Sequence, residues 1–307
     1  MKSVYIDEDL EAIATQVRQY VEKEIVPNAE PWETEGMVPR EILIQMGSLG
    51  FFGLRAPEQY GGIGMGATAS VVLAEELGRS TFGGFTITVL AHTDLALPYI
   101  LRFASDDLKA RYLPVMVDGE IIGALAVTEP DAGSDVAAIR TTARRDGDEW
   151  VINGSKMFIT NGVHGDMVVV AAKTDTDAKP SRGVSMFAVD QGTPGLTVGR
   201  SLPKMGWKSS DTAELIFEDC RVPLDRLIGE ENRGFYYIME NFQNERLILA
   251  GQALGEAQRA IELTIDHLKS RKAFGGVLWD KQVTRHRMAW AQTNVDAARE
   301  LMYRAAW

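Results

Sequence analysis

Two short segments of the chain carry residue types that suit the binding of a flat ligand with an anionic part. The first, residues 125–134 (LAVTEPDAGS), begins as an apolar strand and breaks at Glu129 and Pro130. Gly133 then permits unusual backbone angles, and the small side chains around it leave amide N–H groups uncovered. Exposed amides beside the hydroxyl of Ser134 form a suitable binding site for a pyrophosphate.

The second segment, residues 156–162 (KMFITNG), is an aromatic strand that ends in an Asn-Gly turn signal. A hydroxyl lies near the end of each strand, Thr128 in the first segment and Thr160 in the second. With the aromatic face of Phe158 between them, these groups suit a flat ring with polar edges. Two ordinary strands and a loop would show the same spacing, so the pattern alone leaves both interpretations open.

Glu245 is the candidate for acid–base chemistry. Helical spacing places it on one face with Ile238, Phe242 and Leu249. A carboxylate on an apolar stripe is costly unless it is paired, and burial raises its pKa. A raised pKa is what a base needs to accept a proton from a weakly acidic carbon. An ion pair between helices, or a solvent-exposed glutamate at the edge of the stripe, fits the pattern as well. Glu256 lies on the same stripe, so that face of the helix is not entirely apolar.

Composition limits the class of protein. With 307 residues, 45% of them hydrophobic, the chain can bury a large core and is expected to form two or three domains. Its net charge of −11 argues against a nucleic-acid or anionic-membrane surface. The single cysteine, Cys220, fits a reducing compartment, and four scattered histidines argue against a metal site. The sequence shows no uninterrupted apolar run of about 20 residues and no signal-peptide core. We expect a cytoplasmic protein without membrane insertion.

Hydrophobic periodicity divides the chain into helices, a sheet and helices again, which predicts an α+β protein. The expected domains are an N-terminal helical domain (1–120), a middle antiparallel β-domain or small barrel (121–226), and a C-terminal helical domain (227–307). Helical spacing occurs at 7–25, 40–50, 67–78, 90–103, 106–117, 234–268 and 284–307. Strand spacing occurs at 150–152, 167–172, 184–189, 196–198 and 215–217, with turn signals at 146–147, 153–154 and 194–195.

One polar stretch interrupts the apolar helices of the N-terminal part. His92, Thr93 and Asp94 stand between hydrophobic runs. Their position favours the lining of a pocket, although a role in helix capping or in packing explains them equally well.

Four motifs carry a resemblance to a known family. They are residues 57–62 (PEQYGG), 127–135 (VTEPDAGSD), 153–162 (NGSKMFITNG) and 271–275 (RKAFG). In these motifs and in their order the chain resembles the acyl-CoA dehydrogenases along its whole length. The resemblance implies an N-terminal helical domain, a middle β-domain and a C-terminal helical bundle, with FAD between the last two and a homotetrameric assembly. It also implies that the C-terminal bundle is incomplete here, and we expect further helices after Trp307 in the complete protein.

The resemblance assigns a set of residues to FAD. Thr128 would approach the pyrimidine edge of the flavin, and Thr160 would lie near N5. Phe158 occupies the position where many members stack a tryptophan on the flavin. Gly133 and Ser134 would contact the diphosphate. The full set is Leu125, Val127, Thr128, Gly133, Ser134, Phe158, Ile159 and Thr160, with Arg271, Phe274 and Gln282 reaching the adenosine half across a subunit interface.

The resemblance also implies the substrate and the reaction. Residues 244–247 (NERL) match the isovaleryl and long-chain subgroups, in which the catalytic glutamate precedes an arginine on this helix. Glu245 would remove a proton from Cα of an acyl-CoA as hydride leaves Cβ for flavin N5, giving trans-2-enoyl-CoA. An electron-transferring flavoprotein would then accept the electrons. The implied substrate contacts are Ser134, Ser181, Arg182, Tyr236, Asn244 and Arg246.

Two alternatives remain at this point. Acyl-CoA oxidases and flavin monooxygenases share the fold and pass electrons to oxygen. Some relatives of the fold bind DNA without catalysis, but the acidic balance of this chain and the absence of a basic stripe in its C-terminal region argue against that class. The length and branching of the acyl chain are not readable from the sequence.

Overall fold

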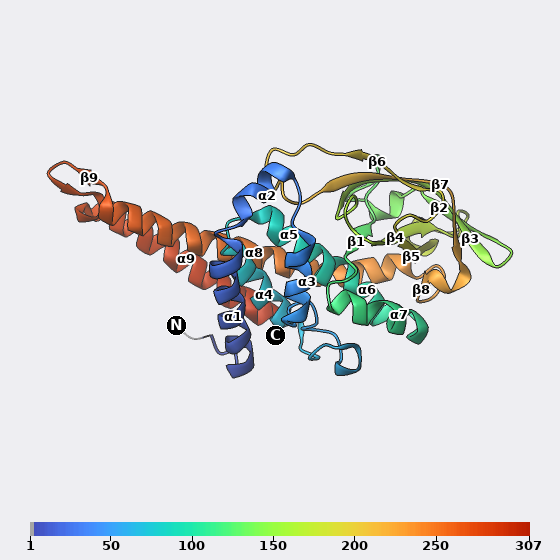
Figure 1. Ribbon diagram of the computed structural model, residues 1–307, viewed down its shortest axis with the longest axis horizontal. Helices are drawn as coiled ribbons and strands as arrows, with labels where there is room; N and C mark the ends of the chain where they lie inside the picture. The colour runs from blue at the N-terminus through green and yellow to red at the C-terminus, as the bar shows by residue number, and fades with distance from the viewer. Residues whose placement is uncertain (1–2) are drawn as a thin grey trace.

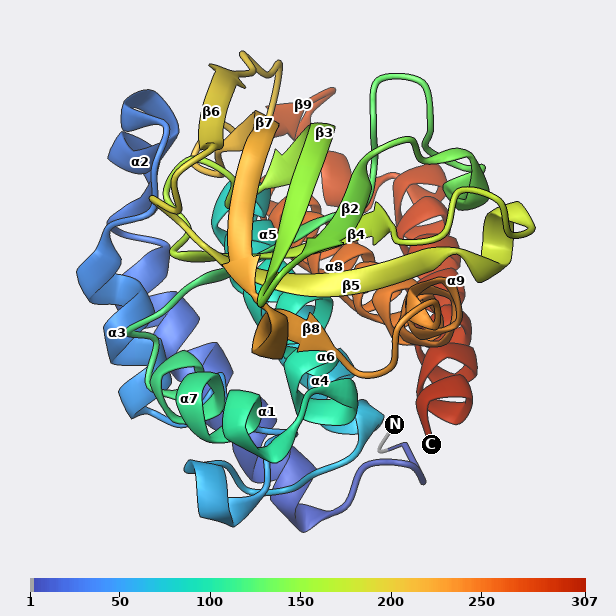
Figure 2. The same ribbon diagram turned by 90° about the vertical axis from the view of Figure 1, so that its right-hand side faces the viewer.

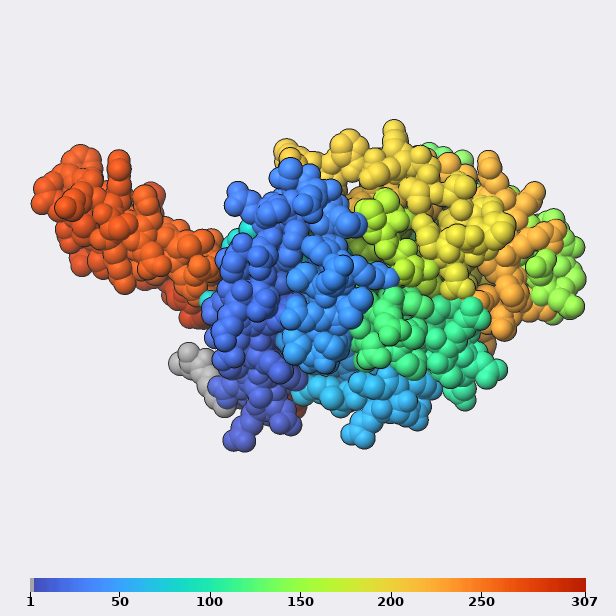
Figure 3. All heavy atoms as spheres, in the orientation of Figure 1, coloured from blue at the N-terminus to red at the C-terminus, as the bar shows by residue number. Residues whose placement is uncertain are grey.

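A computed structural model of the chain describes residues 3–307. Figure 1 shows three parts along the long axis: a sheet at one end, a helical body in the middle, and an arm made of two long antiparallel helices. In the space-filling view the arm stands clear of the body (Figure 3). The order helices, sheet, helices is the one that the hydrophobic periodicity predicts.

The N-terminal part is helical. Asp7 begins the first helix because its side chain accepts a hydrogen bond from the amide of Leu10, and Ser105 caps the last helix through Leu108 in the same way. The short helix around Trp32 was not predicted. The helices, including two π-helical turns, are α1 (Glu8–Tyr20), η1 (Val21–Ile25), α2 (Ala29–Glu35), α3 (Arg40–Ser48), α4 (Ala67–Gly78), α5 (Gly83–Leu90), η3 (Ala91–Ala96), α6 (Leu97–Phe103) and α7 (Asp106–Val117).

Elements α5, η3 and α6 form one helical stretch, Gly83–Phe103, that is long and apolar enough by length and composition to cross a membrane. The sequence shows no unbroken apolar run of that length because His92, Asp94 and Arg102 interrupt it. In the structure 89% of the apolar window is buried inside the protein, as in the central helix of a packed core.

The middle part is a sheet in the order β6-β7-β3-β2-β4-β5-β8, with β1 beside β4 (Figure 2). Most neighbours pair antiparallel, as predicted, but β1 runs parallel to β4, and one residue pair joins β2 to β4 in the same sense. The strands are β1 (Gly123–Ala126), β2 (Thr142–Asp146), β3 (Glu149–Thr160), β4 (Met167–Lys173), β5 (Val184–Asp190), β6 (Leu196–Ser201), β7 (Thr212–Pro223) and β8 (Leu227–Ile228).

The turn predicted at Asn153 and Gly154 is wrong, because both residues lie inside β3. Asn153 exchanges hydrogen bonds with Asp219 on β7, and the register between the two strands shifts at this point. Gly154 has a φ of +145°, and a Cβ there would lie 2.5 Å from the hydroxyl oxygen of Thr141. The Asn-Gly pair therefore forms a β-bulge under a neighbouring segment rather than a hairpin.

The C-terminal part consists of α8 (Gly234–Ser270), a small hairpin formed by β9 (Lys272–Ala273) and β10 (Gly276–Val277), and α9 (Gln282–Ala306). Helix α8 crosses α4 at backbone contact. A Cβ on Gly255 would lie 1.9 Å from the carbonyl oxygen of Glu75, and a Cβ on Gly78 would lie 2.3 Å from that of Gln252. Glycine at these two positions lets the helices approach closely enough to fix their relative rotation and translation.

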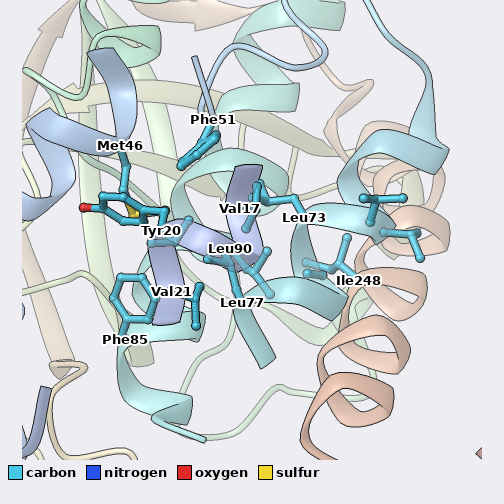
Figure 4. Packing of buried hydrophobic residues seen from close by; sticks show 14 of the residues in the cluster. Val17, Tyr20, Val21, Met46, Phe51, Leu73, Leu77, Phe85, Leu90 and Ile248 are labelled. Carbon is cyan, nitrogen blue, oxygen red and sulfur yellow. The ribbon is translucent and has the colours of Figure 1, made fainter. Parts of the chain in front are cut away.

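Helix α8 takes part in two separate hydrophobic cores. Ile248 packs with Val17, Leu73 and Leu77 in the helical core (Figure 4), so helices from both ends of the sequence share one interior. Ile238 packs instead in a core between α6, α7 and one face of the sheet. Glu245 lies between these two anchors, at the junction of the helical body and the sheet.

Candidate active site

The structure brings the two predicted ligand-binding segments together. The amide of Met157 donates a 2.8 Å hydrogen bond to the carbonyl of Thr128, which joins the end of the first segment to the second. The ammonium of Lys156 reaches across to the same place and donates to the carbonyl of Val127 at 3.1 Å and to Glu129 at 2.7 Å. Residues 127–129 and 156–157 therefore form one unit, although about 30 positions separate them.

Glu129 and Lys156 form a buried ion pair, with side chains 6% and 0% exposed. Burial lowers the pKa of Lys156 to about 8, against the attraction of Glu129. Burial alone would raise the pKa of Glu129, but Lys156 and the amides of Arg140 and Thr141 hold it below its usual value. Those amides donate to Glu129 at 2.6 and 3.0 Å. The pair thus closes the loop 130–141, which carries Gly133 and Ser134.

Phe158 is presented to solvent by a strained backbone. Its φ is +63°, and the register of β3 against β7 shifts between Lys156 and Ile159. A bulge of this kind re-aims a side chain, and a left-handed conformation is rare for a large aromatic residue. The side chain is 65% exposed. Such local strain is typical of ligand sites, and the exposed ring fits a stacking partner for a flat cofactor.

We predict that Phe158→Ala weakens FAD binding by roughly 3- to 10-fold, since a stacked aromatic pair contributes about 0.5–1.5 kcal/mol. The stability of the apoprotein should change little because the ring has few buried contacts. Titration of apoprotein with FAD, followed by flavin fluorescence, measures the first effect and thermal unfolding the second. Ile63→Ala is the matched control, because Ile63 is also exposed, at 54%, but lies in the N-terminal loop. Unchanged FAD affinity in Phe158→Ala would contradict the stacking assignment.

The other predicted FAD residues of the middle domain lie around this unit. Gly133 and Ser134 are exposed on the closed loop, and Thr128, Thr160 and Leu125 are half-buried. Val127 and Ile159 are buried and contribute packing and backbone. An exposed aromatic face, half-buried hydroxyls and an exposed Gly-Ser turn match the ring, the polar edge and the diphosphate of FAD, so the residues fit that cofactor.

The loop that carries the predicted CoA contacts lies near the same turn. Ser181 and Arg182 belong to a short helical turn, η5 (Pro180–Arg182), which contacts the turn η4 (Val136–Ala138) that begins two residues after Ser134. Ser181 is half-buried and the Arg182 guanidinium is exposed. The same turn also contacts α8. Ser134, Ser181 and α8 therefore border one region of the surface.

Glu245 is half-buried on α8, and its Oε1 accepts a 2.7 Å hydrogen bond from the side-chain amide of Asn241. Burial raises the pKa of Glu245 to about 7, and the negative charge of Asp94 adds to the shift. The amide of Asn241 and the cation of Arg246 act in the opposite direction. A carboxyl group with this pKa exchanges a proton readily near neutral pH.

The neighbours of Glu245 on α8 have different surroundings. Arg246 is exposed, stacks over Phe242 and donates to its carbonyl, so its guanidinium is held beside the base. Tyr236 is 42% exposed and stacks against Arg233. Asn244 points inward instead, and its amide donates to the carboxylate of Asp94 at 3.1 Å. Of the predicted substrate residues, Asn244 is therefore the one whose observed partner lies inside the protein.

Three predicted FAD residues are not brought to this site within one chain. Arg271, Phe274 and Gln282 lie around the hairpin at the tip of the arm, at the opposite end of the molecule from the sheet (Figure 1). The 26 residues from Glu245 to Arg271 span roughly 40 Å of helix. The hairpin borders an open hollow of about 590 Å³, and Phe274 is 87% exposed.

Several polar residues surround Glu245, and two of them, Arg55 and Tyr99, were not predicted from the sequence as site residues. Asp94 is 1% exposed and lies beside Asn244, and Arg55 lies 3.7 Å from its carboxylate. The buried hydroxyl of Tyr99 and the Oδ1 of Asn241 have no hydrogen-bond partner in residues 3–307. Asp94 was predicted from the sequence to line a pocket, or to cap or pack a helix, because it interrupts an apolar stretch, but its contact with Asn244 was not predicted. His92 has a packing role, since its ring bonds the carbonyl of Met116 and the amide of Gly123.

Family models for the N-terminal, middle and C-terminal domains of acyl-CoA dehydrogenases match residues 7–120, 124–220 and 232–307. The long-chain specific acyl-CoA dehydrogenase of Rattus norvegicus is 41% identical over 286 residues, which are 92% of this chain and 66% of that protein. The isovaleryl-CoA dehydrogenase of Pongo abelii is 38% identical over 304 residues, covering 98% and 72%. The chain thus spans about two thirds of the long-chain relatives that it matches. A crystal structure of an acyl-CoA dehydrogenase from Geobacillus kaustophilus has a TM-score of 0.92 at 42% identity and covers 99% of this chain and 80% of the other.

Proposed function

We propose that this chain, which belongs to the acyl-CoA dehydrogenase family, oxidises the Cα–Cβ bond of an acyl-CoA thioester to give the trans-2-enoyl-CoA. The single observation that carries the proposal is Glu245, a half-buried carboxyl group whose pKa is raised to about 7. It lies on α8 between the core of the sheet and the core of the helical body.

The family binds FAD, and the middle domain has the residue types that this cofactor needs. Phe158 offers an exposed face, Thr128 and Thr160 offer hydroxyls, and Gly133 and Ser134 form an exposed turn. When bound, FAD supplies the acceptor for the hydride that leaves Cβ of the substrate. The Glu129–Lys156 pair holds these groups at fixed positions by closing the loop over β3.

Glu245 supplies the proton transfer. Its ionised carboxylate removes the proton from Cα, and the C–H electron pair becomes the new Cα–Cβ double bond as hydride departs from Cβ. Asn241 donates to one carboxylate oxygen, Oε1, and so fixes the rotamer of the side chain. Because a general base works best when its pKa lies near the working pH, the raised pKa of Glu245 suits proton removal at neutral pH.

Other residues of the chain support binding of the thioester. We assign Ser134, Ser181 and Arg182 to the CoA moiety, because they border one region and Arg182 provides an exposed cation for phosphate. We assign Tyr236 and Arg246 on α8 to the acyl side, and Asn244 supports that turn of the helix from within through its hydrogen bond to Asp94.

The electron acceptor and the assembly are part of the same proposal. An electron-transferring flavoprotein takes the electrons, as the family resemblance implies. A homotetramer would cover the large apolar side chains on the C-terminal helices, among them Val283, Trp290 and Leu301, which are 60%, 69% and 70% exposed in one chain. In that assembly Arg271, Phe274 and Gln282 would reach the FAD of another subunit. Cytoplasmic location stays a prediction from the sequence.

The proposal predicts a yellow protein whose flavin is bleached by particular acyl-CoA thioesters without oxygen. The experiment is an anaerobic titration of the complete protein with thioesters of graded length and branching, followed by the visible spectrum and by detection of enoyl-CoA. Oxygen is then admitted, and rapid substrate-linked oxygen consumption would identify an oxidase or monooxygenase instead. A flavin-loaded protein that no acyl-CoA bleaches would overturn the proposed activity.

A further inference from the structure

A buried polar cluster lies behind Glu245, on the side away from the surface of α8. It is centred on Asp94, in the π-helical turn η3 that joins α5 to α6. π-Helical turns are rare and occur often at functional sites. The carboxylate of Asp94 is 1% exposed, yet it is held by Arg55, Thr93 and Asn244. A charge buried in an apolar helix is costly, so its retention calls for a role.

Asp94 accepts hydrogen bonds at two points from the turn of α8 that carries the base. Its main-chain carbonyl accepts from the amide of Asn241 at 3.2 Å, and the same amide donates to Glu245 at 2.7 Å. Its carboxylate accepts from Asn244 at 3.1 Å. Residues 241, 244 and 245 are neighbours on one turn of α8. The position of the base relative to the helical body is therefore defined through Asp94.

The charges around the base come from several elements. Asp94 from η3 and Arg246 from α8 act on Glu245 itself, and the Glu245 charge in turn raises the pKa of the buried Tyr99 on α6, after the larger effect of burial. Arg55 lies 3.7 Å from Asp94 and partly offsets its charge, and its Nη1 atom is buried without a hydrogen-bond partner in the described part of the chain. Arg102 pairs with Glu240 nearby on the same helices.

We propose that Asp94, held between Arg55 and Asn244, is a positioning residue for the Glu245 base. This role rests on the proposed function of Glu245. Asp94 acts by tethering the turn of α8 and by placing a fixed negative charge near the carboxyl group. Arg55 moderates that charge, so the two residues act on the base in opposite directions.

The test measures the pKa of Glu245 without turnover. The unfolding free energy of the protein is compared with that of Glu245→Gln as a function of pH, and the difference locates the pKa of residue 245 in the folded state. The same comparison is then made in Asp94→Asn and in Arg55→Met backgrounds. We expect the midpoint near pH 7 to move down by roughly one pH unit in Asp94→Asn and up in Arg55→Met.

Kinetics supply the second readout. The pH profile of flavin reduction by the best acyl-CoA should shift in the same opposite directions, while Asn244→Ala lowers the rate and leaves the midpoint in place. Midpoints that stay unchanged, or that move in one direction in both charge variants, would overturn the role of Asp94. Opposite midpoint shifts in a protein that no acyl-CoA reduces would support the electrostatic link and overturn the proposed function alone. Arg55→Met carries the test if Asp94→Asn does not fold.

Discussion

Glu245→Gln is expected to slow flavin reduction by acyl-CoA about 10³-fold or more, since general-base catalysis contributes typically 10²–10⁴-fold. Glutamine keeps the size of the side chain and its hydrogen bond from Asn241, but it cannot accept the Cα proton. Single-turnover mixing of the oxidised protein with acyl-CoA under anaerobic conditions measures the rate of bleaching. FAD content should stay at the level of the unmodified protein, because Glu245 has no assigned contact with the cofactor.

Glu256→Gln is the matched control for that variant. Glu256 lies on the same stripe of α8 and also accepts a hydrogen bond from the residue four positions earlier, Gln252. It lies three turns away from Glu245, so its loss should leave the rate within about twofold. A Glu245→Gln protein that bleaches at a near-normal rate, or a Glu256→Gln protein that fails equally, would refute the assignment of the base.

The raised pKa of Glu245 gives this variant a second expected effect, on stability. A carboxyl group whose folded pKa lies above its unfolded value binds more protons in the folded state, so stability falls as pH rises from about 4.5 to about 7. Above pH 7 the ionised, half-buried group costs the fold on the order of 2–3 kcal/mol. Glu245→Gln should therefore be more stable than the unmodified protein at pH 8 and about equal to it at pH 4. Denaturant unfolding at both pH values measures this difference, and activity should decline below pH 7 as the base is protonated.

Lys156→Met is expected to destabilise the fold by roughly 3–5 kcal/mol, the usual result of removing one partner from a buried ion pair. The carboxylate of Glu129, which also accepts the loop-closing bonds from the amides of Arg140 and Thr141, would be left buried without its cation, so the loop 130–141 would be held less firmly. FAD binding should fail with it, because Gly133 and Ser134 lie on that loop. Denaturant unfolding and the flavin content of the purified protein measure both effects.

Two further variants separate charge from packing in this prediction. In Lys156→Met/Glu129→Gln the residual charge is gone, but the amides of Arg140 and Thr141 donate to separate oxygens of Glu129, and the single carbonyl oxygen of glutamine can accept from only one of them, so only part of the stability should return. Arg140→Met breaks an exposed pair with Asp131 on the same loop, with side chains 78% and 70% exposed, and should change stability by less than about 0.5 kcal/mol. A Lys156→Met loss no larger than that of Arg140→Met would show that the buried pair does not hold the loop.

Helix boundaries were predictable from the sequence where the hydrophobic periodicity or a single helix-capping residue determines them. Helix α4 begins after Gly66 and α7 begins after the cap at Ser105, and both predicted ranges agree with the structure. The helix around Trp32 was missed because it has only seven residues between Pro27 and Gly36. The turn at Asn153 was mispredicted because an Asn-Gly pair serves a bulge as well as a hairpin, and the partner that decides is Asp219 on another strand.

The raised pKa of Glu245 was predictable from the sequence, but the residues that support its side chain were not. The apolar stripe of α8 indicated a raised pKa for Glu245, as the structure has it, although Leu249 on that stripe is 45% exposed. Much of the environment comes from Asp94, which lies about 150 positions away in sequence and meets Asn244 only after folding. The left-handed backbone of Phe158 could not be predicted from the sequence either, since it depends on a register shift against β7.

The crossing of α4 and α8 has a consequence for how this protein tolerates sequence variation. Gly78 and Gly255 each face a backbone carbonyl at a distance that leaves no room for a methyl group. Glu245 is carried on the helix that this crossing holds, about three turns from Gly255. A substitution at either glycine would shift that helix and, with it, the base. Harmful alleles are therefore expected at positions that touch neither cofactor nor substrate. Where genetic data mark such glycines, the cause would be the packing of α8 against α4.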